Sequence, residues 1–364
     1  MFTYAMDYED SKKQLFAKIE FLRTQGFEII TSTFEIIQDL QIDKIHIKSK
    51  SEAKNRLVFD IGLHGIEGYV GHSCLMVFLD EYLSLLGLGT EVIIYHAINP
   101  FGMKHYRRNN ENNVDLNRNF SSNDFTSNNT DFEKAVDFFK PKKYTGIFRA
   151  NLSFYLSVIN MVLKYGASTL KAATLLGQKI AQDAIYYSSS EYQRSTKYML
   201  SEIQLNMNNI DQVVWIDLHT GYGPRYQMSI VNSKQEKEIN TEFSHNIHYP
   251  LVLGLNANDF YEIDGDMIEM IYTTHAKTDR SIDLYATCFE FGTLGESLLK
   301  SIKSLKAMLF ENSSYFIPQN DRFRLYTEAL LKEQFLPSEQ IWREKAYQDF
   351  KQAISGILEY KKLI

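Results

Sequence analysis

The chain of 364 residues has few of the residues that mark several protein classes, since it contains only two cysteines and six prolines. Cys74 and Cys288 lie far apart with no CxxC spacing, which excludes a disulfide scaffold and a thiolate zinc cluster and fits a reducing compartment. Basic residues are in the minority, with 39 Lys plus Arg against 45 Asp plus Glu and a formal net charge of −6. Because a nucleic-acid binder is expected to carry a basic footprint, a DNA or RNA partner is disfavoured.

Long apolar runs are also missing. The least charged stretch, residues 151–163, spans 13 residues and contains Asn and Ser, whereas a membrane-spanning helix needs about 20 apolar residues. The first residues are acidic where a signal peptide would be positively charged, and no apolar core follows them. These features predict a cytoplasmic protein with no membrane partner.

Apolar residues are nevertheless abundant, at 44% hydrophobic and 13% aromatic, which is enough to fill a substantial core. Helical periodicity from Leu15 to Leu22 breaks at Gly26 and gives way to a strand pattern. Alternating strand and helix signals predict an α/β fold, with a mixed, largely parallel twisted sheet covered by helices on both faces. The expected strands are 56–63, 91–99, 212–219, 226–231 and 286–291, with a helix over 68–86 between the first two.

The whole chain, 1–364, is expected to form one domain. Helix-like patterns with few strand signals over about 132–208 predict a helical insertion within it. An apolar stripe within 338–363 predicts a C-terminal packing helix. Residues 109–129 are crowded with Asn and Ser, which favour turns, and predict a long surface loop.

Two motifs place histidines where predicted strands end. His64 and Glu67 are three residues apart in an HGIEG segment, so on one helical turn they could point at one ion, although a solvated helix start is the plainer interpretation of this pair taken alone. Asp217 and His219 alternate onto the same face of a strand in WIDLHTG. The carboxyl end of such a strand is where open α/β sheets assemble sites, but a core histidine bonded to its neighbour Asp217 is the plainer interpretation.

Two further motifs carry arginines and an acid. Arg107, Arg108 and the following VDLNRNF segment offer guanidinium and amide groups that can hold a carboxylate, or else form a solvated polar loop. Glu290 stands between two phenylalanines on a predicted strand, so it is either buried and paired or part of a site. All four motifs lie at or between strand ends, so one edge of the sheet could gather them.

Gathered there, two histidines and one glutamate form a set of three ligands with an open fourth position, which is the composition of a catalytic rather than a structural zinc site. The remaining glutamate and arginine would supply the general base and the electrophile that such a zinc needs. In this order the motifs resemble the zinc carboxypeptidase superfamily that includes carboxypeptidase A. The resemblance is strongest to a bacterial subgroup with HGxEG, NVDLNRNF, DLHTGxG and EFGT blocks, and it covers about residues 55–300.

The resemblance implies a role for each matched residue. His64, Glu67 and His219 would be the ligands of one zinc ion per chain, and Asp115 would orient His64. Glu290 would be the base that takes a proton from zinc-bound water.

The basic loop matches the family as well. Arg108, nine positions before Asn117, would polarise the scissile carbonyl, while Asn117 and Arg118 would grip a terminal carboxylate of the substrate. The mobile substrate-binding tyrosine of the family has no clear match among the candidates Tyr261, Tyr272 and Tyr285.

The function implied by the resemblance is zinc-dependent hydrolysis of an amide bond, by a metallocarboxypeptidase acting on a peptide with a free carboxylate. Two alternatives remain at this point. One is an aspartoacylase-like deacylase of N-acyl amino acids, and the other is a non-catalytic module that binds carboxylates through Arg108 and Arg118. Six further histidines are interpreted as surface or packing residues: His72, His96, His105, His245, His248 and His275.

Overall fold

A computed structural model describes residues 2–121, 129–254, 264–278 and 281–364. Within these residues the centre of the molecule is a sheet of eight strands in the order β1-β2-β4-β3-β5-β8-β6-β7. The strands are β1 (Ile29–Ile37), β2 (Leu40–Ile47), β3 (Asn55–Ile61), β4 (Thr90–His96), β5 (Gln212–Gly221), β6 (Met228–Asn232), β7 (Val252–Gly254) and β8 (Asp283–Gly292).

The four central strands, β4, β3, β5 and β8, are parallel, and β1, β2 and β6 add antiparallel pairings at the sides. The central strands read as nearly continuous apolar runs because both faces of the sheet are covered. Parallel pairing brings the carboxyl ends of β3, β5 and β8 to one edge. In this register Asp60 lies beside Asp217, and His219 lies beside Glu290.

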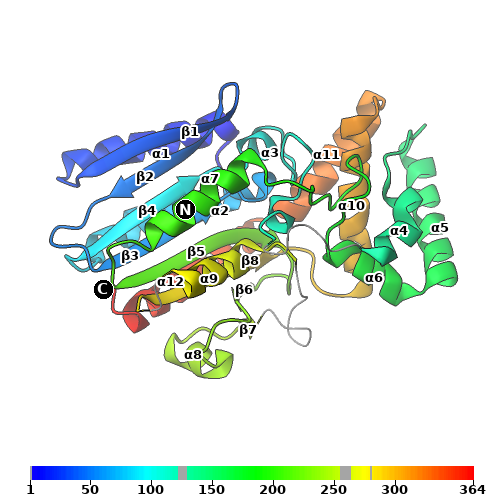
Figure 1. Ribbon diagram of the computed structural model, residues 1–364. Coiled ribbons are helices and arrows are strands. Elements are labelled where there is room, and N and C mark those ends of the chain that lie inside the picture. The colour runs from blue at the N-terminus through cyan, green and yellow to red at the C-terminus, as the bar shows by residue number, and fades with distance from the viewer. Residues whose placement is uncertain (1, 122–128, 255–263, 279–280) are drawn as a thin grey trace.

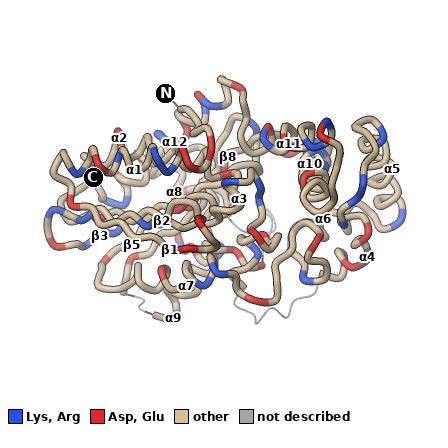
Figure 2. The backbone as a smooth tube through the Cα atoms, turned by 90° about the horizontal axis from the view of Figure 1, so that it is seen from above, with Lys and Arg blue, Asp and Glu red and all other residues tan. Residues whose placement is uncertain are grey.

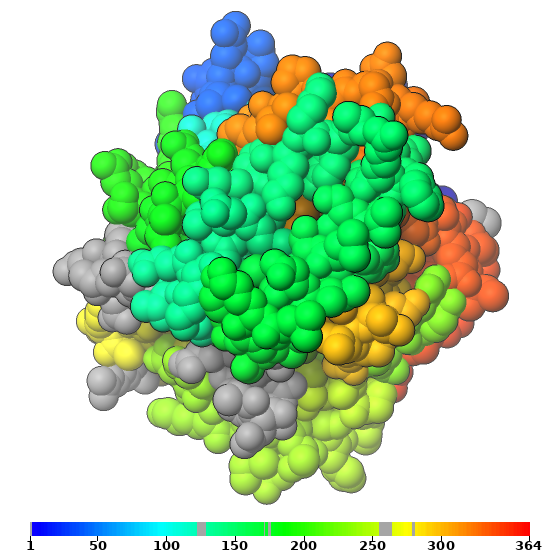
Figure 3. Space-filling model, turned by 90° about the vertical axis from the view of Figure 1, so that its right-hand side faces the viewer, coloured from blue at the N-terminus to red at the C-terminus, as the bar shows by residue number. Residues whose placement is uncertain are grey.

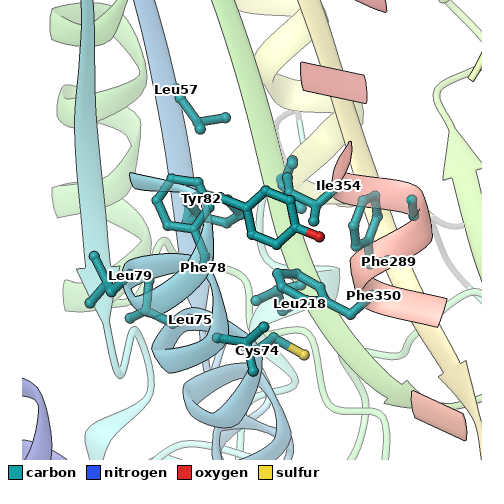
Figure 4. Packing of buried hydrophobic residues seen from close by; sticks show 14 of the residues in the cluster. Leu57, Cys74, Leu75, Phe78, Leu79, Tyr82, Leu218, Phe289, Phe350 and Ile354 are labelled. Carbon is teal, nitrogen blue, oxygen red and sulfur yellow. The ribbon is translucent and has the colours of Figure 1, made fainter. Parts of the chain in front are cut away.

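Helices cover both faces of the sheet (Figure 1). On one face α1 (Tyr8–Thr24), α2 (Gly68–Glu81) and α12 (Gln340–Tyr360) share a core with the strand residues that point their way, such as Leu57, Leu218 and Phe289. Figure 4 shows this packing between α2 and α12. On the other face α7 (Arg194–Asn206) and α9 (Met267–Lys277) pack around Trp215. The predicted α/β fold, with a mixed and largely parallel sheet, is confirmed.

A third group of helices lies beyond one end of the sheet (Figure 1). These helices are α4 (Thr130–Phe139), α5 (Ile147–Tyr165), α6 (Ala167–Leu175), α10 (Leu298–Phe316) and α11 (Asp321–Phe335), and they pack around an apolar cluster of their own. The first three come from the stretch expected as a helical insertion, whereas α7, from the same stretch, covers the sheet. The short helices α3 (Pro100–Lys104) and α8 (Asn240–Asn246) complete the set. None of the described helices is both long enough and apolar enough to cross a bilayer.

The prediction of a surface loop was wrong over residues 109–121, which are mostly buried; residues 122–128 lie outside the described part of the chain. Asparagine amides replace water here. Asn113 Nδ2 donates to the carbonyl oxygens of Gln182 and Ala184 at 2.8 and 3.0 Å, and Asn119 Nδ2 donates to that of Ser188 at 2.7 Å. A polar loop can be buried when its side chains satisfy buried backbone groups in this way.

Candidate metal centre

A tight turn after β3 brings the first motif to the sheet edge. Gly62 has a φ of +72°, a conformation that favours glycine, and His64 follows just before the short 3-10 helix η1 (Gly65–Glu67). A Cβ on Gly65 would lie 2.1 Å from the carbonyl carbon of Gly102, so only glycine lets η1 pack against α3 at this position. The glycines of the HGIEG segment therefore serve close backbone packing that aims the side chains of His64 and Glu67.

Three side chains converge from the ends of two neighbouring strands: His64 and Glu67 follow β3, and His219 lies near the end of β5. The Nδ1 atoms of the two histidines are 3.1 Å apart, and each is 3.0 Å from an oxygen of Glu67. The three side chains are almost fully buried, and their possible ligand atoms all lie within 4.8 Å of one another. The structure thus brings together the three residues that the sequence motifs placed far apart.

A carboxylate stands behind each histidine. Asp115 lies 2.9 Å from Nε2 of His64, and Asp217 lies 2.7 Å from Nε2 of His219, so both Nδ1 atoms are turned toward Glu67. Burial alone would lower the pKa of His219, but Asp217 and Glu67 raise it well above its usual range. The bond between His219 and Asp217 that the sequence suggested for a core histidine is present, and it also orients the ring.

Arg108 joins two of the acids in this cluster. Its Nη1 donates to Glu67 at 3.0 Å and its Nε donates to Asp115 at 3.2 Å. Burial alone would raise the pKa of Asp115, but the charges of Arg108 and His64 hold it well below its usual range. Burial likewise would raise the pKa of Glu67, but His64 and His219 lower it. Both acids are therefore ionised beside the histidines.

Asp60 belongs to the same cluster and was not singled out from the sequence. Its Oδ2 accepts the indole N–H of Trp215, and it lies beside Asp217 in the register of β3 and β5. Burial, together with the charge of Asp217, raises the pKa of Asp60 well above its usual range. The signal was available in the sequence, because an acid within the apolar run RLVFDIGL is unusual for a buried strand.

Glu290 stands next to His219 on the neighbouring strand. Its Oε1 accepts the backbone N–H of Tyr222 at 2.9 Å, which fixes the carboxyl group at the same end of the sheet. Burial raises the pKa of Glu290 to about 8, and the charge of Glu67 adds to this effect. The acid flanked by two phenylalanines is thus placed at the edge of the triad.

Asn117 and Arg118 follow Asp115 in the chain, but the side chain of Asn117 already makes hydrogen bonds within the protein. Its Nδ2 donates to Asp266 at 2.9 Å, and its Oδ1 accepts the backbone N–H of Met267 at 2.9 Å, which ties it to the start of α9. Arg118 is buried, and its Nη1 donates to the carbonyl oxygen of Asn117 at 2.9 Å. For Asn117 to hold a substrate carboxylate, its bonds to α9 would have to be exchanged.

None of the three tyrosines considered from the sequence is placed at the triad by the described residues. The hydroxyl of Tyr272 donates to Glu236, and that of Tyr285 donates to Asn232 at 2.9 Å; Tyr261 lies outside the described residues. The end of α11 is close to the triad instead. The hydroxyl of Thr220, next to His219, donates to the carbonyl oxygen of Phe335 at 2.8 Å.

The resemblance of the sequence motifs implies a zinc ion, and the donor set fits a metal ion. Four-coordinate zinc with bonds of about 2.0–2.1 Å would separate its ligand atoms by roughly 3.4 Å, close to the 3.0–3.1 Å found among the three donors. Imidazole and carboxylate donors suit zinc, and each histidine has the hydrogen-bonded carboxylate that metal-bound histidines usually show.

The chain is similar to one protein family and to several solved structures. The family described as "Protein of unknown function (DUF2817)" matches residues 11–349. No curated protein matches the chain. Among solved structures, thrombin activatable fibrinolysis inhibitor is similar at a TM-score of 0.50 and 15% identity, over 96% of this chain and 75% of that one.

Two other solved structures are similar at lower scores. Carboxypeptidase A from Helicoverpa armigera has a TM-score of 0.46 and 13% identity, over 90% of this chain and 74% of its own. A metallo-carboxypeptidase from Pseudomonas aeruginosa has a TM-score of 0.44 and 11% identity, over 96% and 69%. The chain therefore belongs to the DUF2817 family and has the α/β fold of the zinc carboxypeptidases, as its sequence motifs predicted.

Proposed function

We propose that this protein is a zinc-dependent amide hydrolase, most simply a metallocarboxypeptidase, in which His64, Glu67 and His219 hold the ion. One observation carries the proposal. Three donors that lie far apart in the sequence meet within 3.0–3.1 Å of one another, and carboxylates turn both histidines inward. Buried polar groups are not gathered in this way without a ligand or a strong structural reason.

Zinc, when bound, acts as a Lewis acid on a carbonyl group and lowers the pKa of water toward about 7. Glu290 is the proton carrier at this site: it accepts a proton from the attacking water and passes it to the departing amine. Burial raises the pKa of Glu290 to about 8, and the positive charge of a bound cation would lower it again and so favour the ionised form. The N–H of Tyr222 holds the carboxyl group in place during both transfers.

Arg108 and Arg118 supply the positive charge for the substrate. Arg108 is anchored by Glu67 and Asp115, so its guanidinium is pre-oriented where negative charge develops on the carbonyl oxygen. Arg118 is the proposed partner of a substrate carboxylate, since a guanidinium holds a carboxylate with two parallel hydrogen bonds. Asn117 would join it only after releasing α9, so we assign Asn117 first to the placement of Arg118.

A deacylase of small N-acyl amino acids is the second candidate. The burial of the triad favours it, because His64 and His219 are each only 3% exposed and Glu67 only 1%. A peptide chain needs more room at the zinc than a single acylated amino acid does. The end of α11 contributes to this enclosure through Phe335 and its bond to Thr220.

The test is hydrolysis by the zinc-loaded protein of three matched substrates: a peptide with a free carboxylate, the same peptide amidated, and an N-acetyl amino acid. Glu290→Gln should retain zinc and lose at least about 100-fold in kcat. Glu296→Gln, the same change at an exposed acid in the following loop, should leave kcat unchanged. Unchanged turnover in Glu290→Gln would remove the assigned base, and hydrolysis of the acetyl amino acid alone would establish the deacylase.

A further inference from the structure

Helix α5 presents an apolar face to the solvent. It lies at the outer edge of the end group of helices, on the side that Figure 3 turns toward the viewer. Phe148 is 79% exposed and Leu163 is 81% exposed, and five large apolar side chains between them are also exposed. We call this set the α5 face: Phe148, Leu152, Tyr155, Leu156, Ile159, Val162 and Leu163.

The opposite side of α5 is apolar as well, and it is the side that packs on the rest of the protein. Ala150, Phe154, Val158 and Met161 follow one another at helical spacing and are all buried in the apolar cluster shared with α4 and α10. A polar stripe of Arg149, Ser153, Ser157, Asn160 and Lys164 separates the two apolar sides, whereas a surface helix normally needs only one apolar side, the one that faces the core. Packing within this chain explains one side of α5 and leaves the other unexplained.

The α5 face has an area comparable to that of one side of a protein–protein interface. From the exposed fractions and the ordinary areas of such side chains, it offers roughly 800 Å² of mostly apolar surface. A typical soluble monomer shows no contiguous apolar patch beyond about 300–600 Å², and a stable pair of proteins buries about 800 Å² on each partner. The face therefore has the size of one half of a protein interface.

Its spacing is that of a helix-pairing seam. Phe148, Leu152, Tyr155, Ile159 and Val162 recur at alternating steps of four and three residues, which is the pattern of the contact positions in paired helices. Next to the row formed by Leu152 and Leu156 runs a row of small residues, Ser153 and Ser157. The two rows line a shallow groove on the helix, which Arg149 and Asn160 complete at its ends.

A ridge beside a groove on one helix is self-complementary. In a two-fold pair, the leucine row of each helix can enter the serine row of the other, which is the ridges-into-grooves packing of helices. A partner of different sequence would need to supply the matching groove, whereas a second copy already has it. The shape of α5 thus favours a second copy of this chain.

The charges of α5 favour the same occupant over a lipid surface. Only Arg149 and Lys164, near its two ends, are charged, and Figure 2 shows this helix nearly free of blue and red between them. Interfacial helices that bind anionic membranes usually carry several lysines or arginines along their polar face, and this chain has a net charge of −6. A seam whose charges lie only near its two ends is instead suited to burial of its apolar middle against a second such seam.

We propose that the α5 face is a homodimer interface, in which α5 packs against α5 of a second copy around a two-fold axis. The interface lies outside the candidate metal centre, so it does not depend on the proposed catalytic function. It makes the helices α4 to α6 the assembly element of this chain. Each subunit would contribute the leucine row of α5 to the serine row of its partner.

The test is the molar mass of the full chain in solution by sedimentation equilibrium over a wide concentration range. The wild type should reach twice 42.3 kDa, and Leu152→Glu combined with Leu156→Glu should be monomeric, raising Kd at least about 100-fold. Both leucines are half exposed, so the monomer should keep its circular dichroism spectrum. Leu85→Glu combined with Leu88→Glu is the matched control at the opposite end of the sheet and should remain dimeric.

A second variant separates shape from mere stickiness. Ser157→Phe adds apolar area but fills the groove, so the seam predicts weaker dimerisation, whereas non-specific adhesion predicts stronger association. A wild type that is monomeric at every concentration would overturn the proposal, and so would a dimer that survives the double glutamate variant. Binding of a monomeric wild type to vesicles of phosphatidylcholine and phosphatidylglycerol, lost in that variant, would assign the face to lipid instead.

Discussion

Two pairs of buried histidines lie in this molecule, and their surroundings differ. The rings of His64 and His219 are 4.8 Å apart, and those of His72 and His96 are 5.5 Å apart. In the first pair both ring nitrogens of each histidine meet a carboxylate at 2.7–3.0 Å. In the second pair, His96 has no hydrogen-bond partner for either nitrogen within the described structure, and Nε2 of His72 is 3.3 Å from the amide oxygen of Gln14.

The electrostatic outcome is opposite in the two pairs. The carboxylates around His219 raise its pKa, whereas burial lowers the pKa of His72 to about 4 and that of His96 well below its usual range. The nearest acid to His96 is Asp43, at 3.9 Å, and it is paired with Lys12 at 3.0 Å. Burial of two histidines together is thus not enough to make a metal site; carboxylates within bonding distance of the ring nitrogens make the difference.

Removal of the first pair should have the largest effect. His64→Ala combined with His219→Ala should reduce zinc from about one ion per chain to background, because the remaining donor, Glu67, cannot hold the ion alone. Elemental analysis of protein purified without a histidine tag measures this. The matched control, His72→Gln combined with His96→Gln, should keep its zinc, and loss of zinc in the control would contradict the distinction between the two pairs.

The second pair should govern stability in acid. Because His72 stays neutral in the fold, with a pKa of about 4 against about 6.5 when unfolded, protonation favours the unfolded chain. The contribution of neutral His72 to the free energy of unfolding is complete above pH 6.5. It is lost as the pH falls toward 4, and at pH 4 the loss amounts to about 3 kcal/mol. Urea unfolding of the metal-free protein at pH 7 and pH 4.5 measures the loss.

His72→Phe, which keeps a ring of similar size, should flatten this pH dependence relative to the wild type. Subtracting the pH dependence of the variant from that of the wild type removes the contributions of the other titrating groups. These include His219, whose raised pKa gives a contribution of the opposite sign. An equally steep loss of stability in the variant would show that His72 is not responsible.

The carboxylates behind the first pair should tune the metal affinity. Asp115→Asn and Asp217→Asn should each weaken zinc binding about 10–100-fold, since these acids fix the orientation of His64 and His219 and raise their basicity. Competition with a zinc chelator gives the affinity. Asp43→Asn, the same change beside His96, should leave it unchanged, and equal losses at all three positions would point to a general effect of charge.

The smallest effect is expected at Asp60. Burial raises its pKa and so favours the neutral carboxyl group, and Asp60→Asn, which is also neutral, can still accept the bond from Trp215. The free energy of unfolding should change by less than about 1 kcal/mol. Asp60→Leu, which removes the bond from Trp215, should destabilise by more, and a severe loss in Asp60→Asn would show that the ionised form is present.

The sequence predicted those parts of the fold in which the residues of a single helix or strand determine its structure. Continuous apolar runs gave β3, β4, β5 and β8, because a strand covered on both faces needs apolar residues on both sides. Strand β2 was missed, since its pattern LQIDKIHI places charges within a buried strand. The buried asparagine loop was misjudged for a similar reason: propensity records what a residue does in water, not which backbone groups it satisfies inside the protein.

The sequence by itself determined the chemistry available in this protein: two histidines and a glutamate in recognisable motifs, an isolated acid in a strand, and a helix with apolar residues on two of its sides. Only the tertiary structure decided which of these meet. It brought the Nδ1 atoms of His64 and His219 within 3.1 Å, left His72 and His96 with no carboxylate at hydrogen-bonding distance within the described residues, and turned one apolar face of α5 outward. The physical reason is that spacing along the chain fixes side-chain direction within one helix or strand, whereas distances between elements depend on sheet register and on helix packing.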